Sequence, residues 1–188
     1  MHRANVGSGL TFNTMDTPRR PLLFLDVDGP LVPFGAMPAD HQPSTVDERP
    51  RCTNPLTTRV DRELGPLLLD LSCELVWATT WVHEANQVVG PLLGLPALAV
   101  VEWPDRTDHQ IDEWFGLHWK TRTLVEWAAC RPFIWVDDEI SDNDREWVSD
   151  HHGDGALLHR VDPRIGLLHS DFAHFVEWLA AAELAGGT

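Results

Sequence analysis

The sequence has no long hydrophobic run and few cysteines. No apolar stretch approaches the roughly 20 residues of a membrane-spanning helix, so we expect no membrane association. Residues 1–21 lack the apolar core of a secretory signal, and we interpret them as a flexible N-terminal tail. The three cysteines lack metal-ligand spacing, and Cys73 and Cys130 stand beside apolar runs, which indicates small core residues. These absences favour a cytoplasmic protein without disulfides.

Lysine is nearly absent, and the charge is uneven. Of 14 basic residues only Lys120 is a lysine, so either chance left one lysine or this position needs an ammonium group. The net charge is −15, and residues 63–188 account for the excess, with 22 acidic and seven basic side chains. Such a surface repels nucleic acid at long range, so we do not expect a nucleic-acid partner. The acidic surface does not exclude binding of a nucleic-acid end through local contacts.

Short apolar segments alternate with amphipathic ones along the chain. Segments that are apolar at successive positions are typical of buried parallel strands, and apolar residues at helical spacing predict helices between them. The expected strands are 22–25, 74–79, 98–101, 133–136 and 156–161. The expected helices are 58–71, 83–93, 119–130, 142–151 and a last one that begins after Ser170. This alternation predicts one α/β domain over residues 22–188, built on a Rossmann-like doubly wound parallel sheet.

Three of the expected strands end in reactive side chains. These are Asp26 and Asp28 after the first strand, Thr79 and Thr80 at the second, and Asp137 and Asp138 at the fourth. In a parallel sheet these strand ends share one edge, outside which ligands bind. Several carboxylates in one place oppose each other's ionisation, and a divalent cation with oxygen ligands relieves this. We therefore expect Mg²⁺ as the cofactor.

These residue types suit phosphoryl transfer. The Asp26 carboxylate can attack phosphorus and form an aspartyl-phosphate. Asp28 stands two residues on, hence on the same side of an extended chain, and can protonate the leaving oxygen and then activate water. Gly29 allows a sharp turn beneath a bound phosphate. The Thr79 hydroxyl and the Lys120 ammonium can neutralise and orient the phosphoryl oxygens.

Four segments, in order, resemble the motifs of the haloacid dehalogenase (HAD) superfamily. Residues 25–31 (LDVDGPL) are similar to its first motif, and residues 76–79 (VWAT) to the second. Lys120 matches the third motif, and residues 134–138 (IWVDD) with Asp142 resemble the acidic fourth. One such motif is a weak signal, whereas four in the expected order are specific. The likeness spans residues 22 to about 142 and is loosely shared with stand-alone bacterial HAD domains related to RNA-repair proteins.

The resemblance implies Mg²⁺ bound by Asp26, the carbonyl oxygen of Asp28 and Asp138, with Asp137 close by and Asp142 behind the ligands. An acid at position 28 is typical of the phosphatase and phosphotransferase branches of the superfamily.

The resemblance also bears on substrate access. Residues 30–55 contain six prolines and read as a flap rather than a helical cap, and the segment between Thr80 and Lys120 is short. Both features indicate a minimal-cap (C0-like) member, and such members often act on large or exposed phosphate esters. We expect substrate contacts from Gly29, Thr80, Trp81 and Asn86. Thr79 is favoured over Thr80 as the residue of the second motif.

The expected function is a Mg²⁺-dependent phosphatase that hydrolyses a phosphate monoester through an aspartyl-phosphate. Its substrate would be a phosphorylated small molecule or an exposed phosphate ester. One alternative is a phosphatase or phosphotransferase that processes nucleic-acid ends. Another is a non-catalytic binding module with the HAD fold, which would not need all of these reactive groups.

Overall fold

The computed structural model describes residues 20–35, 55–104, 112, 114 and 116–186. The expected tail therefore lies outside the described residues except for its last two positions. Positions 36–54 of the expected 30–55 flap lie outside them as well. None of the described helices combines the length and apolar character that a membrane crossing requires.

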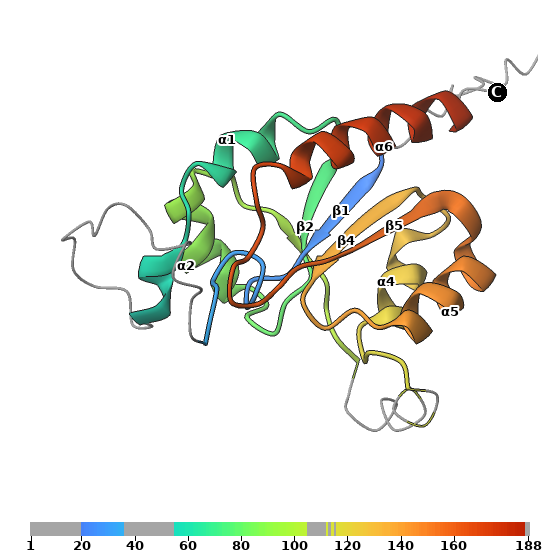
Figure 1. Ribbon diagram of the computed structural model, residues 1–188, viewed down its shortest axis with the longest axis horizontal. Coiled ribbons are helices and arrows are strands. Elements are labelled where there is room, and N and C mark those ends of the chain that lie inside the picture. The colour runs from blue at the N-terminus through green and yellow to red at the C-terminus, as the bar shows by residue number, and fades with distance from the viewer. Residues whose placement is uncertain (1–19, 36–54, 105–111, 113, 115, 187–188) are drawn as a thin grey trace, which may run out of the picture.

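Five parallel strands form one sheet in the order β3-β2-β1-β4-β5 (Figure 1). The strands are β1 (Leu22–Leu25), β2 (Glu74–Trp77), β3 (Ala99–Val100), β4 (Phe133–Asp137) and β5 (Ala156–Arg160). Parallel neighbours require crossover connections, which the intervening helices provide. The described residues form no second sheet, so the expected doubly wound α/β class is confirmed.

Helices cover both faces of the sheet (Figure 1). One face carries α1 (Leu64–Leu69), α2 (Glu84–Leu93) and α6 (Asp171–Gly186), and the other carries α4 (Thr121–Ala128) and α5 (Asp142–His152). Successive strand residues point to opposite faces, so Leu23 and Leu25 pack with the first group and Leu22 and Phe24 with the second. Burial on both faces explains why β1 is apolar at every position.

The expected helix 58–71 is the main difference in secondary structure. The chain instead forms a short 3₁₀ helix, η1 (Pro55–Arg59), and starts α1 only at Leu64. Pro66 explains the late start, because a proline is tolerated in the first turn of a helix, where no intrahelical N–H bond is needed. A Cβ atom on Gly65 would lie 1.8 Å from the Leu93 carbonyl oxygen, so glycine permits the close approach of α1 to α2.

The two described cysteines differ in environment. Cys73 is buried, as expected, but Cys130 is exposed, which corrects the prediction of a core residue. Cys130 follows the end of α4 in a left-handed turn, where Ala129 and Cys130 have φ of 49° and 68°. The turn directs this side chain to the surface although the neighbouring sequence is apolar.

Candidate active site

The strand order reverses between β1 and β4. The chain proceeds from β1 outward to β2 and β3, and then returns to the other side of β1 as β4. In open α/β sheets ligands bind outside the carboxyl ends of the strands at such a switch point. Asp26 directly follows β1, and its N–H donates to the Val136 carbonyl at 3.1 Å. This places it beside Asp137, the last residue of β4.

Three carboxylates converge at this point around one ammonium group. Asp26, Asp137 and Asp138 each offer an oxygen, and these oxygens lie within 4.8 Å of one another. Lys120, which directly precedes α4, places Nζ 2.7 Å from Asp26 Oδ2 and 2.8 Å from Asp137 Oδ2. All four residues are buried, and Lys120 is only 2% exposed. The structure thus brings together residues that are more than 100 positions apart in the sequence.

Burial and crowding change how these groups ionise. Burial raises the pKa of Asp26 to about 7; nearby Lys120 opposes this shift, and Asp137 adds to it. Burial and then the Asp137 carboxylate raise the pKa of Asp138 to about 6. Burial disfavours the Lys120 ammonium, but Asp26 and Asp137 together raise its pKa. One ammonium does not balance three carboxylates, so this oxygen-rich group fits a hard divalent cation such as Mg²⁺.

The two acids at the end of β4 have different surroundings. Asp137 Oδ2 accepts hydrogen bonds from Lys120 and, at 3.2 Å, from the Trp135 indole N–H. Its Oδ1 accepts the Glu139 backbone N–H at 3.0 Å. Both oxygens of Asp137 are therefore engaged within the protein and fix Lys120. Asp138 is the acid of this pair that fits the metal-ligand role implied by the resemblance.

Gly29 lies directly against Asp138. It has a φ of 86°, a left-handed conformation that glycine adopts without strain. A Cβ atom at this position would lie 2.6 Å from both Cγ and Oδ1 of Asp138. The glycine therefore makes room for the Asp138 carboxylate, a role that the sequence pattern alone did not reveal.

Asp28 is not one of the three carboxylates whose oxygens lie within 4.8 Å of one another. Its Oδ2 accepts a hydrogen bond from the indole N–H of Trp81 at 2.8 Å, across 53 positions of the sequence. The resemblance assigned only the carbonyl oxygen of Asp28 to the metal, and the side chain remains available for proton transfer. Trp81 was predicted to contact substrate, and the structure places its polar atom on Asp28.

The two threonines after β2 are clearly distinguished by burial. Thr79 is fully buried, its Oγ1 accepts the Trp81 backbone N–H at 3.3 Å, and its carbonyl accepts the Trp103 indole N–H at 2.9 Å. Thr80 is exposed. Thr79 is therefore the buried threonine at the carboxyl edge of β2, and its role as the residue of the second motif stays a prediction.

Asn86 occupies a structural position. Its Oδ1 accepts the Trp77 indole N–H at 2.8 Å and the Leu98 backbone N–H at 2.9 Å, and its Nδ2 donates to the Leu98 carbonyl at 2.9 Å. These bonds tie the start of α2 to β2 and to the segment before β3. These bonds give Asn86 an anchoring role, and its contact with substrate stays a prediction.

Asp144, rather than Asp142, is the buried acid after the fourth motif. Asp142 lies exposed in the first turn of α5 and is not part of the carboxylate group. Asp144 is fully buried and accepts hydrogen bonds from the backbone N–H groups of Ser141 and His118, both at 2.8 Å, and from the Ser141 and Thr121 hydroxyls. It thereby fixes the start of α4, next to Lys120. The signal in the sequence is Ser141 followed three residues later by an acid, a capping-box pattern.

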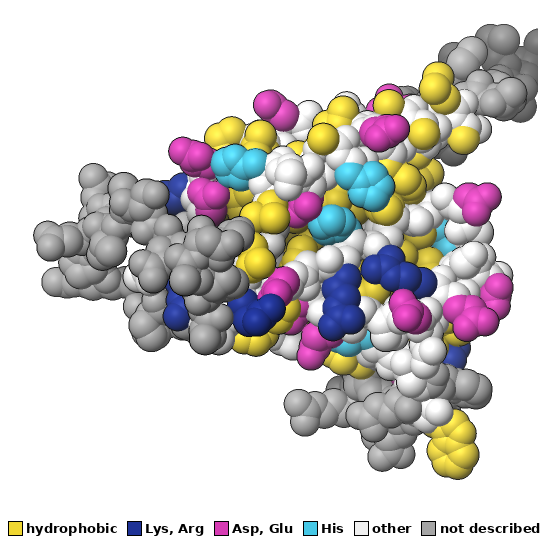
Figure 2. Space-filling model, in the orientation of Figure 1, with side chains coloured by type: hydrophobic (Ala, Val, Ile, Leu, Met, Phe, Trp, Pro, Cys, Tyr) yellow, Lys and Arg dark blue, Asp and Glu magenta, His cyan; other side chains and the backbone are white. Residues whose placement is uncertain are grey.

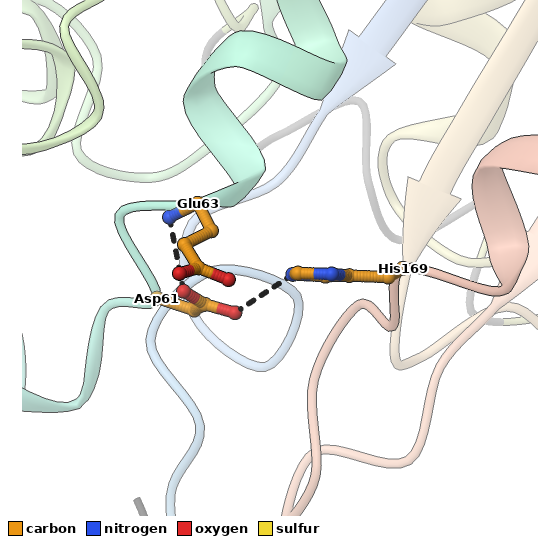
Figure 3. Close-up of side chains that lie close together, drawn as sticks. All are labelled: Asp61, Glu63 and His169. Carbon is orange, nitrogen blue, oxygen red and sulfur yellow. Dashed lines mark hydrogen bonds and ion pairs between the residues drawn. The ribbon is translucent and has the colours of Figure 1, made fainter. Parts of the chain in front are cut away.

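A second group of possible ligands lies on the surface. Asp61, Glu63 and His169 are all exposed (Figure 3). Asp61 Oδ1 accepts the Glu63 backbone N–H at 3.0 Å, and Asp61 Oδ2 lies 3.1 Å from His169 Nε2. These bonds hold the Asp61 carboxylate in place, and all three side chains are accessible to solvent, which screens their charges. The buried carboxylates at the switch point are the stronger candidate site.

A comparison with known families identifies the segment of the chain that contains this site. A family model described as the HAD domain in Swiss Army Knife RNA repair proteins matches residues 22–172, which include all four motif segments. No curated protein and no solved structure matches the chain. HAD domains are in general phosphatase-type hydrolases. The chain therefore belongs to the HAD superfamily, in the family of HAD domains of the Swiss Army Knife RNA repair proteins.

Proposed function

We propose that this chain is a Mg²⁺-dependent phosphatase that hydrolyses a phosphate monoester through an aspartyl-phosphate on Asp26. The observation that carries the proposal is the buried group of Asp26, Lys120, Asp137 and Asp138 at the switch point of the sheet. Burying three carboxylates around one ammonium is costly, and a structural role alone does not require it. Such perturbed, clustered ionisable groups are typical of catalytic sites.

Each residue of the site has a separate role in the proposed reaction. The Asp26 carboxylate attacks phosphorus, and the bond from phosphorus to the leaving oxygen breaks. Asp28 donates a proton to that oxygen and afterwards takes one from the water that hydrolyses the aspartyl-phosphate. Lys120 and the Thr79 hydroxyl neutralise and orient the phosphoryl oxygens. Asp26, Asp138 and the Asp28 carbonyl would hold Mg²⁺, which supplies further neutralisation of the phosphoryl charge.

A second candidate substrate is a phosphorylated nucleic-acid end. The family description names RNA repair proteins, and a groove of about 490 Å³ lined by residues 160–164 lies next to the site. The Arg160 guanidinium is fixed there, because its Nε donates to the Asp138 carbonyl at 2.9 Å. Figure 2 shows basic side chains gathered in the middle of this face, with acidic ones around them. A local basic patch could hold a strand end despite the net charge of −15.

The first test is phosphate release from p-nitrophenyl phosphate with and without Mg²⁺. Wild-type protein should release phosphate only with the metal. The Asp26→Asn variant keeps the acceptor for the Val27 N–H and should fold normally, yet lose turnover by about a thousandfold or more, as expected for a missing nucleophile. Asp150→Asn, at an exposed position of α5, is the matched control and should retain full activity. Undiminished release by Asp26→Asn would rule out the covalent mechanism.

A substrate panel separates the two candidates. Phosphate release should be compared between phosphorylated metabolites and oligonucleotides that carry a 5′- or 3′-phosphate. A clear preference for oligonucleotides, reduced by Arg160→Gln and by added salt, would favour end processing. A preference for small esters that salt does not change would favour a metabolic phosphatase. A wild-type protein without turnover on any substrate would indicate a binding module.

A further inference from the structure

The contact between Trp81 and Asp28 depends on a constrained turn. Trp81 is half-buried in the turn after β2, where its backbone N–H donates to Thr79 Oγ1 and the Val82 N–H donates to the Thr79 carbonyl, both at 3.3 Å. Val82 has a φ of 46°, which is a strained conformation for a β-branched residue. Such strain persists where the surroundings fix the backbone, often at functional sites. The turn therefore directs the indole N–H towards Asp28 Oδ2, 2.8 Å away.

We propose that Trp81 is a positioning residue that holds Asp28 for proton delivery to the leaving oxygen. As a consequence, the enzyme is suited to esters of alcohols, whose leaving oxygen must be protonated as it departs. This inference rests on the proposed phosphatase function. It differs from the predicted substrate contact, because Trp81 acts through Asp28 and not on the substrate.

The chemistry of the indole fits this role. Its N–H is a donor only and carries no charge. The bond holds one oxygen of the carboxyl group, so it restricts rotation of the Asp28 side chain. Because it engages Oδ2, Oδ1 is the oxygen that carries the transferable proton.

Each step then balances. In the first step an Asp26 oxygen forms a bond to phosphorus, the bond from phosphorus to the leaving oxygen breaks, and its electron pair stays on that oxygen. The oxygen takes the proton from Asp28, which becomes a carboxylate. In the second step the water oxygen forms a bond to phosphorus and water gives a proton to Asp28, while the bond from phosphorus to the Asp26 oxygen breaks and its electron pair stays on Asp26. Inorganic phosphate, the Asp26 carboxylate and protonated Asp28 result.

The test compares two leaving groups in wild-type protein and Trp81→Phe. p-Nitrophenolate departs as a stable anion and needs no proton, whereas the alkoxide of glycerol 2-phosphate does. The parameter is kcat/KM, which reports the steps up to the first phosphoryl transfer. We expect Trp81→Phe to lower it about 10- to 100-fold for glycerol 2-phosphate, part of the 10²–10⁴-fold that general acids supply, and about twofold at most for the nitrophenyl ester. Trp81→His, which restores an N–H donor, should recover part of the loss.

The control is Trp77→Phe, which removes another indole bond of 2.8 Å, to Asn86, away from Asp28. Trp77→Phe should change kcat/KM by the same factor for both substrates. An equal loss on both substrates in Trp81→Phe, or no loss, would overturn the inference. So would a wild-type protein that hydrolyses the nitrophenyl ester but not the alkyl ester. If Trp81→Phe does not fold, the same comparison is made with Trp81→Leu, which also lacks the indole N–H that donates to Asp28. Failure of the proposed function would appear separately, as absence of wild-type turnover that depends on Asp26.

Discussion

Replacing Lys120 by methionine removes the ammonium group from between Asp26 and Asp137 and keeps a long side chain in its place. In the native protein Nζ lies 2.7 Å and 2.8 Å from the two carboxylates, and Lys120 is 2% exposed. The variant leaves the buried carboxylates without their cation. Removing one partner of a buried ion pair typically costs about 3–5 kcal/mol of the free energy of unfolding, and we expect a loss in this range at about pH 7.5 without Mg²⁺.

The loss should depend on pH. Burial raises the pKa of Asp26 to about 7 even beside Lys120, so at about pH 5.5 this carboxyl is mostly protonated in the folded protein. A protonated Asp26 needs no cation, and Lys120→Met should then cost less than at about pH 7.5. Mg²⁺ should restore part of the lost stability at the higher pH, because it supplies positive charge to the same carboxylates.

Urea unfolding followed by tryptophan fluorescence, at the two pH values with and without Mg²⁺, measures these differences. Arg164→Met is the matched control, since it breaks an ion pair to Asp162 on the surface that solvent screens. It should leave stability unchanged at both pH values. A Lys120→Met variant that loses less than about 1 kcal/mol at pH 7.5, or loses the same amount at both pH values, would refute the reasoning.

The remaining predictions concern the metal ligands and their supports. Burial raises the pKa of Asp26 to about 7 and of Asp138 to about 6, above the unfolded value of 3.8, so the metal-free protein should lose stability as pH rises from about 4 to 7. Over the upper part of that range, calorimetry should show Mg²⁺ binding more tightly as pH rises, and affinity that does not depend on pH would contradict this. Gly29→Ala should cost at least about 1–2 kcal/mol, because its φ is 86°, and should weaken Mg²⁺ binding, because the new Cβ would lie 2.6 Å from Asp138. Unchanged Mg²⁺ affinity would show that the close contact has no role. Asp144→Ala should cost about 3 kcal/mol or more in thermal or chemical unfolding, since it leaves buried donors unsatisfied, whereas Asp142→Ala should stay within about 1 kcal/mol of wild type. A larger loss of stability in Asp142→Ala than in Asp144→Ala would mean that Asp142 is the acid that supports the site.

The strands and the acids that follow them could be predicted, because both depend on only a few neighbouring residues. Burial on both faces makes a central parallel strand apolar throughout, and residues 22–25 show this directly. Asp26 and Asp138 follow such strands, and the fold rule that ligands bind at the carboxyl edge then places them near each other. Lys120 was marked by its rarity and by its place at the head of the expected helix 119–130. The strands and the main carboxylates at their ends followed from these signals.

Other features depend on which side chains the fold brings side by side. The late start of α1 reflects its packing against α2 together with Pro66. Asp142 and Asp144 are two residues apart in the first turn of one helix, and only the position of α4 decides which of them is buried. The amide of Asn86 bonds to Trp77 and Leu98, an anchoring role that the sequence pattern did not indicate.

The sequence by itself determined the fold class, the family and the types of reactive groups at the end of each strand. These properties follow from the periodicity of apolar residues and from short motifs, both of which act over a few neighbouring residues. Only the tertiary structure decided that Lys120 lies between Asp26 and Asp137, that Gly29 makes room for Asp138, and that the Trp81 indole donates to Asp28. The direction of a side chain depends on the packing of distant segments, which no local pattern specifies.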